Sequence, residues 1–140
     1  MNQLETEWTS SKTDEMKKKW PSFRGADGSA FVKGTKTPFK WDDSSGEHVL
    51  WKVPVPAAGN SSPIVWGDRL FLSGGTDSPS VLCFHAIKGD LLWQQTLNPP
   101  AHTGDQPWKV SGSAGLASPT MATDGHFVYA IFASGELFAL

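Results

Sequence analysis

The chain has 140 residues and carries 12 Lys and Arg against 14 Asp and Glu, which gives a formal net charge of −2 at pH 7. This balance favours neither a nucleic-acid partner nor an anionic membrane surface. No stretch approaches the roughly 20 apolar residues of a membrane-spanning helix, and no secretory signal peptide is visible at the start of the sequence. The composition instead includes 14 Gly, 10 Pro and 7 Trp, which favours turns, strands and large aromatic anchors.

The first two segments of the chain carry few strand signals. Residues 1–19 are polar and charged, and between a frayed helix and a disordered arm we favour disorder. Residues 20–47 are punctuated by Gly and Pro, with isolated aromatic anchors at Phe23, Phe31, Phe39 and Trp41. We expect this segment to be an irregular lead-in that packs onto another part of the protein, because its own core would be thin.

From residue 48 to residue 140 the sequence predicts strands. Short apolar or alternating runs cover residues 48–55, 62–66, 69–74, 80–86 and 90–97. Tight polar turns separate them, and Gly67-Asp68 and residues 88–90 have the composition of hairpin connections. The pattern predicts an antiparallel meander.

An internal repeat runs through this region. Trp51 and Trp93 are 42 residues apart, whereas Pro63 and Pro119 are 56 apart. The extra residues lie in a long connection after residue 97. Four short antiparallel strands in about 40–45 residues indicate a blade of a β-propeller, and the recurring Trp then packs between neighbouring blades.

The repeat also predicts how many blade strands the sequence contains. We expect one complete four-stranded unit over residues 62–97, the last strand of a preceding unit over 48–55, and three strands of a following unit over 117–140. The fourth strand of that unit would lie beyond residue 140. We therefore expect a fragment of a larger propeller, about two blades long.

A family resemblance rests on the sequence FHAIKGDLLW, residues 84–93. It resembles the blade motif of quinoprotein-like, PQQ-binding-like propeller repeats, Ala-x-Asp-x-x-Thr-Gly-x-x-x-Trp, with Gly89 and Trp93 matching. His85 stands in place of the consensus Asp, and we expect it to act in the turn. Residues 20–25, 50–72 and 111–140 are similar to a bacterial, planctomycete-type subgroup of these proteins. The resemblance implies an all-β, partial quinoprotein-like propeller of antiparallel four-stranded blades, exported to the periplasm or cell envelope.

The long connection after residue 97 is the candidate binding loop. It contains His102, Asp105, Trp108 and Lys109, and long loops on a propeller face are where binding residues gather. A solvated loop without a ligand is the alternative. The partner would be a protein or a small ligand, and no nucleic acid or membrane span is expected.

No catalytic, cofactor-binding or metal-binding residue can be assigned. Cys83 lies within an apolar strand, where we expect a buried and unreactive thiol, and we expect packing roles for Trp51, Trp66 and Trp93. The four His residues are too scattered for a metal motif. Residues 42, 43 and 47 are acidic but lack the ligand spacing of a calcium loop.

Two functions remain open at this stage. The first is a non-catalytic binding or scaffold propeller in the bacterial envelope, which associates with further blades of its parent protein or with itself through open sheet edges. The second is the N-terminal part of a PQQ- and calcium-dependent alcohol or sugar dehydrogenase, whose active-site residues would lie in other blades. The resemblance implies PQQ and calcium only in the second case.

Overall fold

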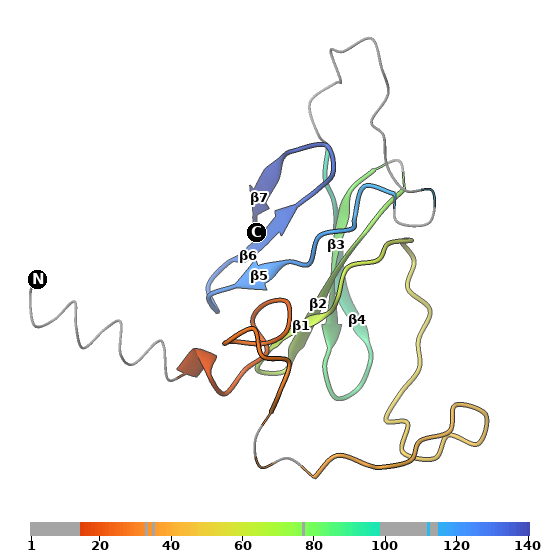
Figure 1. Ribbon diagram of the computed structural model, residues 1–140. Helices are drawn as coiled ribbons and strands as arrows, with labels where there is room; N and C mark the ends of the chain where they lie inside the picture. The colour runs from red at the N-terminus through yellow and green to blue at the C-terminus, as the bar shows by residue number, and fades with distance from the viewer. Residues whose placement is uncertain (1–14, 33, 35, 77, 99–111, 113–114) are drawn as a thin grey trace, which may run out of the picture.

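The computed structural model describes residues 15–32, 34, 36–76, 78–98, 112 and 115–140, which form seven strands in two antiparallel sheets (Figure 1). The four-stranded sheet has the order β1-β2-β3-β4, with β1 (Ile64–Trp66), β2 (Arg69–Gly74), β3 (Ser80–His85) and β4 (Leu91–Thr96). The three-stranded sheet has the order β5-β6-β7, with β5 (Ala122–Thr123), β6 (Val128–Ile131) and β7 (Leu137–Ala139). The predicted all-β fold of antiparallel blades is confirmed.

Hairpins connect strands that are neighbours in both sequence and space. Trp66 pairs with Arg69, so Gly67 and Asp68 form a two-residue turn between β1 and β2. Gly67 has a φ of 61°, a left-handed conformation that glycine adopts without steric cost. The strands predicted between residues 62 and 97 are therefore confirmed, and so are three strands within 117–140.

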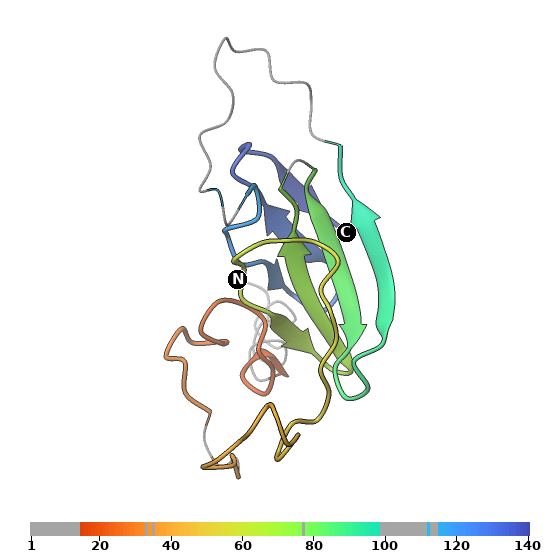
Figure 2. The same ribbon diagram turned by 90° about the vertical axis from the view of Figure 1, so that its right-hand side faces the viewer.

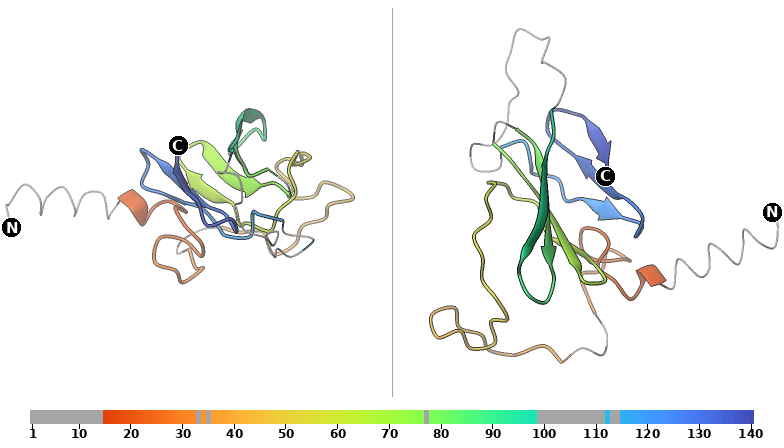
Figure 3. Two further views of the ribbon diagram at one scale, coloured as in Figure 1. Left: turned by 90° about the horizontal axis from the view of Figure 1, so that it is seen from above. Right: turned by 180° about the vertical axis from the view of Figure 1, so that it is seen from behind.

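The hydrophobic core lies between the two sheets, which pack as two layers (Figure 3). Because side chains alternate along a strand, one face of the four-stranded sheet presents Ile64, Phe71, Val81 and Cys83. The three-stranded sheet covers this face with Met121, Val128, Ala130 and Phe132. Burial of each large apolar side chain contributes about 1.5–3 kcal/mol, so this interface joins the two sheets into one structure.

The second sheet repeats the register of the first, with one change in a turn. Ala122 pairs with Tyr129 as Ile64 pairs with Phe71, so β5 and β6 both lie 58 residues after β1 and β2, two more than the interval of 56 predicts. The β6–β7 connection is two residues shorter than the β2–β3 connection, and β7 therefore returns to the interval of 56. The cross-strand pair Tyr129 and Ala139 therefore corresponds to Phe71 and Cys83 in the four-stranded sheet.

The strand predicted over residues 48–55 is not formed, and this prediction was wrong. A strand needs a neighbouring strand to pair with, and no described residue supplies one to this segment. The segment instead runs along the four-stranded sheet, from the β3–β4 turn to the end of β2 (Figure 2). Trp51 is held at the first of these places, where its Nε1 donates a 2.9 Å hydrogen bond to the carbonyl of Ala86.

Backbone hydrogen bonds join the lead-in to β1 of the four-stranded sheet and to β5 of the three-stranded sheet. Trp20 and Val65 exchange two backbone hydrogen bonds, of 3.1 and 2.8 Å, and the amide of Thr123 donates to the carbonyl of Pro21 at 2.9 Å. Trp20 and Pro21 thus bridge the edges formed by β1 and β5. Of the polar arm predicted over residues 1–19, residues 1–14 lie outside the described residues, and residues 15–16 are helical.

Candidate functional site

The predicted binding loop lies outside the described residues, and this includes His102, Asp105, Trp108 and Lys109. The structure does describe where the long connection leaves and re-enters the fold. Leu97 and Leu116, at its two ends, are both buried in the core. The amide of Leu116 donates to the carbonyl of Gly75, and its carbonyl accepts from the amide of Ala133. The connection is therefore anchored beside the β2–β3 and β6–β7 turns.

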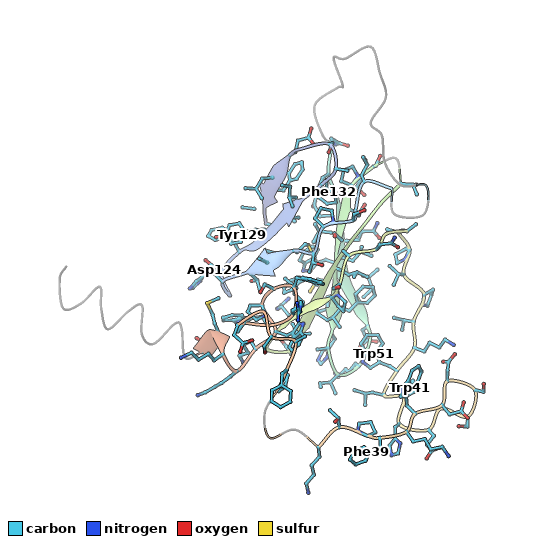
Figure 4. All side chains as sticks on the ribbon, viewed as in Figure 1. Phe39, Trp41, Trp51, Asp124, Tyr129 and Phe132 are labelled. Atoms are coloured by element: carbon cyan, nitrogen blue, oxygen red, sulfur yellow. The ribbon has the colours of Figure 1, made fainter. Side chains whose placement is uncertain are left out.

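The three-stranded sheet has an apolar face that no described residue covers. Tyr129 and Ile131 of β6, and Leu137 and Ala139 of β7, point away from the core; we call these four residues the outer face. Figure 4 shows Tyr129 on this side of the sheet and Phe132 on the side of the core. Ile131 is 46% exposed and Leu137 is 68% exposed. Both faces of this sheet are thus apolar, but only one is packed.

A polar group lies at one end of the outer face. The hydroxyl of Tyr129 donates to Asp124 Oδ2 at 3.3 Å. Burial and the nearby Asp124 carboxylate raise the pKa of Tyr129, so the phenol stays neutral at ordinary pH. Asp124 itself is held by the turn, because its Oδ1 accepts hydrogen bonds from the amides of His126 and Phe127 at 2.9 Å each. The outer face is therefore uncharged apart from this fixed carboxylate.

The edge of the same sheet is open at β7. Val128 exchanges backbone hydrogen bonds with Leu140, and the amide of Phe132 donates to the carbonyl of Glu136. Because backbone groups alternate between the two sides of a strand, the intervening residues Leu137 and Ala139 direct their N–H and C=O groups away from β6. No strand of the described residues pairs with them. The strand that β4 supplies in the other sheet therefore has no counterpart among the described residues of this sheet.

Two buried polar atoms beside this edge lack partners. Ser134 Oγ and Glu136 Oε2 make no hydrogen bond to another described residue although both atoms are shielded from solvent, and Ser134 is only 6% exposed. A buried polar atom without a partner costs about 1–3 kcal/mol, more if it is charged. Buried polar atoms in native proteins are nearly always satisfied. The partners of these two atoms are therefore not among the described protein groups.

Two cavities lie elsewhere on the molecule. One, of about 320 Å³, lies at the end of the interface between the sheets, where Trp66, Arg69 and Trp93 meet His126 and Leu140. The other, of about 730 Å³, lies between the end of the polar arm and the lead-in, and its lining includes Lys17, Lys18, Lys19, Trp20 and Phe31. Both are open grooves at the ends of the strands, unlike the flat outer face.

The periodic tryptophans act in packing. The ring of Trp51 lies over Gly89, where a Cβ would come within 2.7 Å of it. Trp93 is half-buried rather than enclosed, and its ring lies 6.1 Å from that of Phe71. Trp66 packs on Gly125 in the same manner. The predicted packing roles are confirmed for all three, although Trp93 is less buried than a central anchor.

The turn role predicted for His85 is also confirmed. Its Nδ1 accepts hydrogen bonds from the amides of Ile87 and Lys88 at 3.2 and 3.3 Å, which requires a neutral imidazole with its proton on Nε2. These are the bonds that a carboxylate at a turn makes. The histidine thus substitutes for the acidic residue in the β3–β4 turn.

Cys83 is fully buried in the core. Burial raises the pKa of its thiol, and the nearby Arg69 opposes this shift. The thiol is therefore protonated at neutral pH and inaccessible to reagents, which confirms the predicted buried thiol.

The acidic cluster forms an exposed turn. Asp42 Oδ1 accepts from the amide of Ser44 at 2.7 Å, and this and other backbone hydrogen bonds lower the pKa of Asp42. Lys52 and Asp43 form an exposed ion pair of 2.6 Å. Among the described residues no three His, Cys, Asp or Glu side chains come together as a metal-binding group.

Comparisons with known proteins identify the repeat. No curated protein and no solved structure matches the chain significantly. Residues 5–140 match a PQQ-repeat family model described as outer membrane protein assembly factor BamB. In the part of the chain that the structure describes, no helix is long and apolar enough to cross a membrane. With its two antiparallel sheets as successive propeller blades, the chain belongs to this BamB-like family of PQQ-repeat proteins.

Proposed function

We propose that this chain is a non-catalytic β-propeller module that binds a protein partner in the bacterial cell envelope. The observation that supports the proposal is the outer face of the three-stranded sheet, where Ile131 and Leu137 are largely exposed beside Tyr129. Contiguous exposed apolar surface on a soluble domain marks an interaction site.

The shape of this surface favours a protein over a small molecule. Small-molecule sites are concave and enclose most of their ligand, whereas the outer face is one exposed side of a sheet. The inner face of the same sheet packs on the four-stranded sheet through Met121, Val128 and Ala130. An apolar sheet is therefore a suitable partner for a surface of this kind. A partner that presents an apolar sheet fits the outer face, whether it is a further blade of the parent protein, a second copy of the chain or another protein.

Exposed aromatic side chains of the lead-in are further candidate contacts for a protein partner. Phe39 is 108% exposed and Trp41 is 70% exposed relative to reference values, and both lie on the projecting loop of the lead-in (Figure 4). Large exposed aromatic residues are typical of protein interfaces. The predicted loop residues His102, Asp105, Trp108 and Lys109 remain a second candidate surface.

The envelope location is part of the proposal. It is supported by the family description, which names an outer membrane protein assembly factor. A non-catalytic module of this kind needs neither PQQ nor calcium. The alternative, the N-terminal part of a PQQ-dependent dehydrogenase, has no positive support among the described residues.

Site-specific photocrosslinking tests the proposal. A photoreactive phenylalanine analogue at Leu137 should give a discrete crosslinked protein in cells that express the natural protein, and Ile131→Asp should abolish it. The matched control places the same analogue at Ile87, which is 64% exposed on the β3–β4 turn, and should give no discrete product. Identical crosslinks from both positions, or none from Leu137, would refute a binding role for the outer face.

A further inference from the structure

The larger of the two grooves, of about 730 Å³, is both apolar and positively charged; we call it the basic groove. Its lining includes Trp20, Phe31, Val32 and Val65, which are apolar, and Lys17, Lys18, Lys19 and Asp27, which are charged. Three lysines against one aspartate give these residues a formal charge of +2. Phe31 is 67% exposed and Val32 is 49% exposed. A ligand that fits this groove therefore combines negative charge with an apolar group.

The loop of residues 22–30 supports the basic groove. The amide of Ala30 donates to the carbonyl of Arg24 at 2.8 Å and closes this loop. Arg24 and Ala30 have φ values of 62° and 59°, a left-handed conformation that is unfavourable for residues other than glycine and that clusters at ligand-binding and active sites. The ring of Trp20 packs on Gly25, where an added Cβ would lie 3.1 Å from it. The fold thus sets the shape of the groove before a ligand arrives.

The basic groove lies at the edge of β1, where the first strands of the two sheets meet. β1 and β5 are in contact, and the amide of Ser62, before β1, donates to Thr120 Oγ1, before β5, at 3.0 Å. Figure 1 shows the lead-in beside these two strands. Because propeller blades surround a central channel, this edge lies on the channel side of the two blades. Successive sheets pack face to face in this chain, so further blades cover sheet faces and leave the groove accessible.

We propose that the basic groove binds an extended acidic segment of a protein partner, and that this segment carries an aromatic side chain. Its carboxylates pair with Lys18, which is exposed, and Lys19, which is half-buried, through charge-assisted hydrogen bonds. Its ring packs on Trp20 and Phe31. The basic groove is a second binding surface, separate from the outer face, and it does not depend on the binding role of that face.

The arrangement of charge favours a peptide over other anions. The three lysines are consecutive in the sequence, so their Cα atoms are about 3.8 Å apart, and a row of carboxylates matches them better than a single anion does. Membrane-binding clusters usually contain about four to eight Lys or Arg. A nucleic acid would bring phosphates close to Asp27, and the net charge of −2 repels a polyanion.

Calorimetric titration of the full 140-residue chain with unlabelled peptides is the experiment. The probe is the acetylated and amidated peptide GEFEEG. One control peptide, GQFQQG, lacks the charges, and the other, GEAEEG, lacks the ring. GEFEEG should bind at least about tenfold more tightly than either control. Raising the NaCl concentration from about 0.05 M to about 0.5 M should weaken the binding of GEFEEG much more than that of GQFQQG, because salt screens the ion pairs.

Matched charge variants locate the site. The double change Lys18→Glu and Lys19→Glu should weaken the binding of GEFEEG at least about tenfold. Its control, with the same change in net charge, is Lys36→Glu and Lys40→Glu, at exposed lysines outside the groove. The control should bind GEFEEG nearly as well as the native chain.

Matched aromatic variants test the apolar part of the groove. Phe31→Ser should lower the affinity for GEFEEG towards that for GEAEEG. Phe39→Ser removes another exposed ring, outside the groove, and should have no effect. Ile131→Asp alters the outer face and should also leave peptide binding unchanged.

Some results overturn the proposal. They are equal affinities for GEFEEG and GQFQQG, no saturable binding below ~1 mM, equal effects of the two double lysine variants, or an unchanged affinity in Phe31→Ser. Loss of binding in Ile131→Asp would place the peptide on the outer face instead. If the chain sediments with phosphatidylglycerol vesicles, and the change Lys18→Glu with Lys19→Glu releases it, the groove binds a lipid surface and not a peptide.

Discussion

Replacing Gly89 by alanine tests whether the ring of Trp51 fixes the β3–β4 turn. Gly89 has a φ of 79°, and an alanine in this left-handed conformation costs about 1–2 kcal/mol. The new Cβ would also lie 2.7 Å from Trp51 Cδ2, so the ring must move. Its movement breaks the hydrogen bond from Nε1 to the carbonyl of Ala86, which contributes about 1 kcal/mol. We expect a total loss of about 2–3 kcal/mol in the free energy of unfolding.

Urea unfolding followed by far-UV circular dichroism measures this loss. Gly135→Ala is the matched control, because Gly135 also has a positive φ, of 92°, but nothing lies within 4 Å of its missing Cβ. It should cost only the conformational term, about 1–2 kcal/mol. In a Trp51→Ala background, Gly89→Ala should cost no more than this control. Equal losses for the two glycines in the native background would show that Trp51 does not clamp the turn.

Three further changes probe other contacts. Trp93→Ala should cost about 2–3 kcal/mol, since the ring is half-buried against Phe71; an unchanged urea midpoint would contradict this. His85→Ala should cost about 1 kcal/mol by removing the acceptor of two amides, whereas His85→Asp keeps an acceptor and should be nearly neutral in thermal unfolding. Burial raises the pKa of Cys83 from 9.0, so its contribution to stability is complete below that pH and is lost as the pH rises through the raised value. The urea midpoint should therefore fall as the pH rises above 9.0, and fall less in Cys83→Ala; equal decreases would argue against the burial effect.

The outcome at residues 48–55 shows where sequence patterns are insufficient. The alternating apolar residues and Trp51 predict a strand there, and Trp51 does occupy a packing position like that of a blade tryptophan. A ladder nevertheless requires a partner strand, and partners are far away in sequence. The alternation of apolar residues predicts which side chains share a face of a segment. It does not predict whether a neighbouring strand is present to pair with that segment.

The outer face also depends on which neighbours are present. The sequence analysis predicts binding by polar residues of the long loop. The outer face consists instead of Tyr129, Ile131, Leu137 and Ala139, which are ordinary strand residues by type. The signal that could have found it is the repeat itself. A strand that is apolar on both faces needs cover on both, and the end of β7 has the same pattern as β3.

The sequence by itself determined the local elements of this protein: the hairpin turns, the strands with their alternating faces, and the repeat that makes two blades. These follow from residue type and spacing, because turn conformation and side-chain alternation are local properties. Only the tertiary structure decided which apolar faces are covered, and that the segment over residues 48–55 packs beside a sheet without pairing as a strand. Burial and hydrogen-bond satisfaction depend on residues far apart in the chain, and only the folded arrangement brings those residues together.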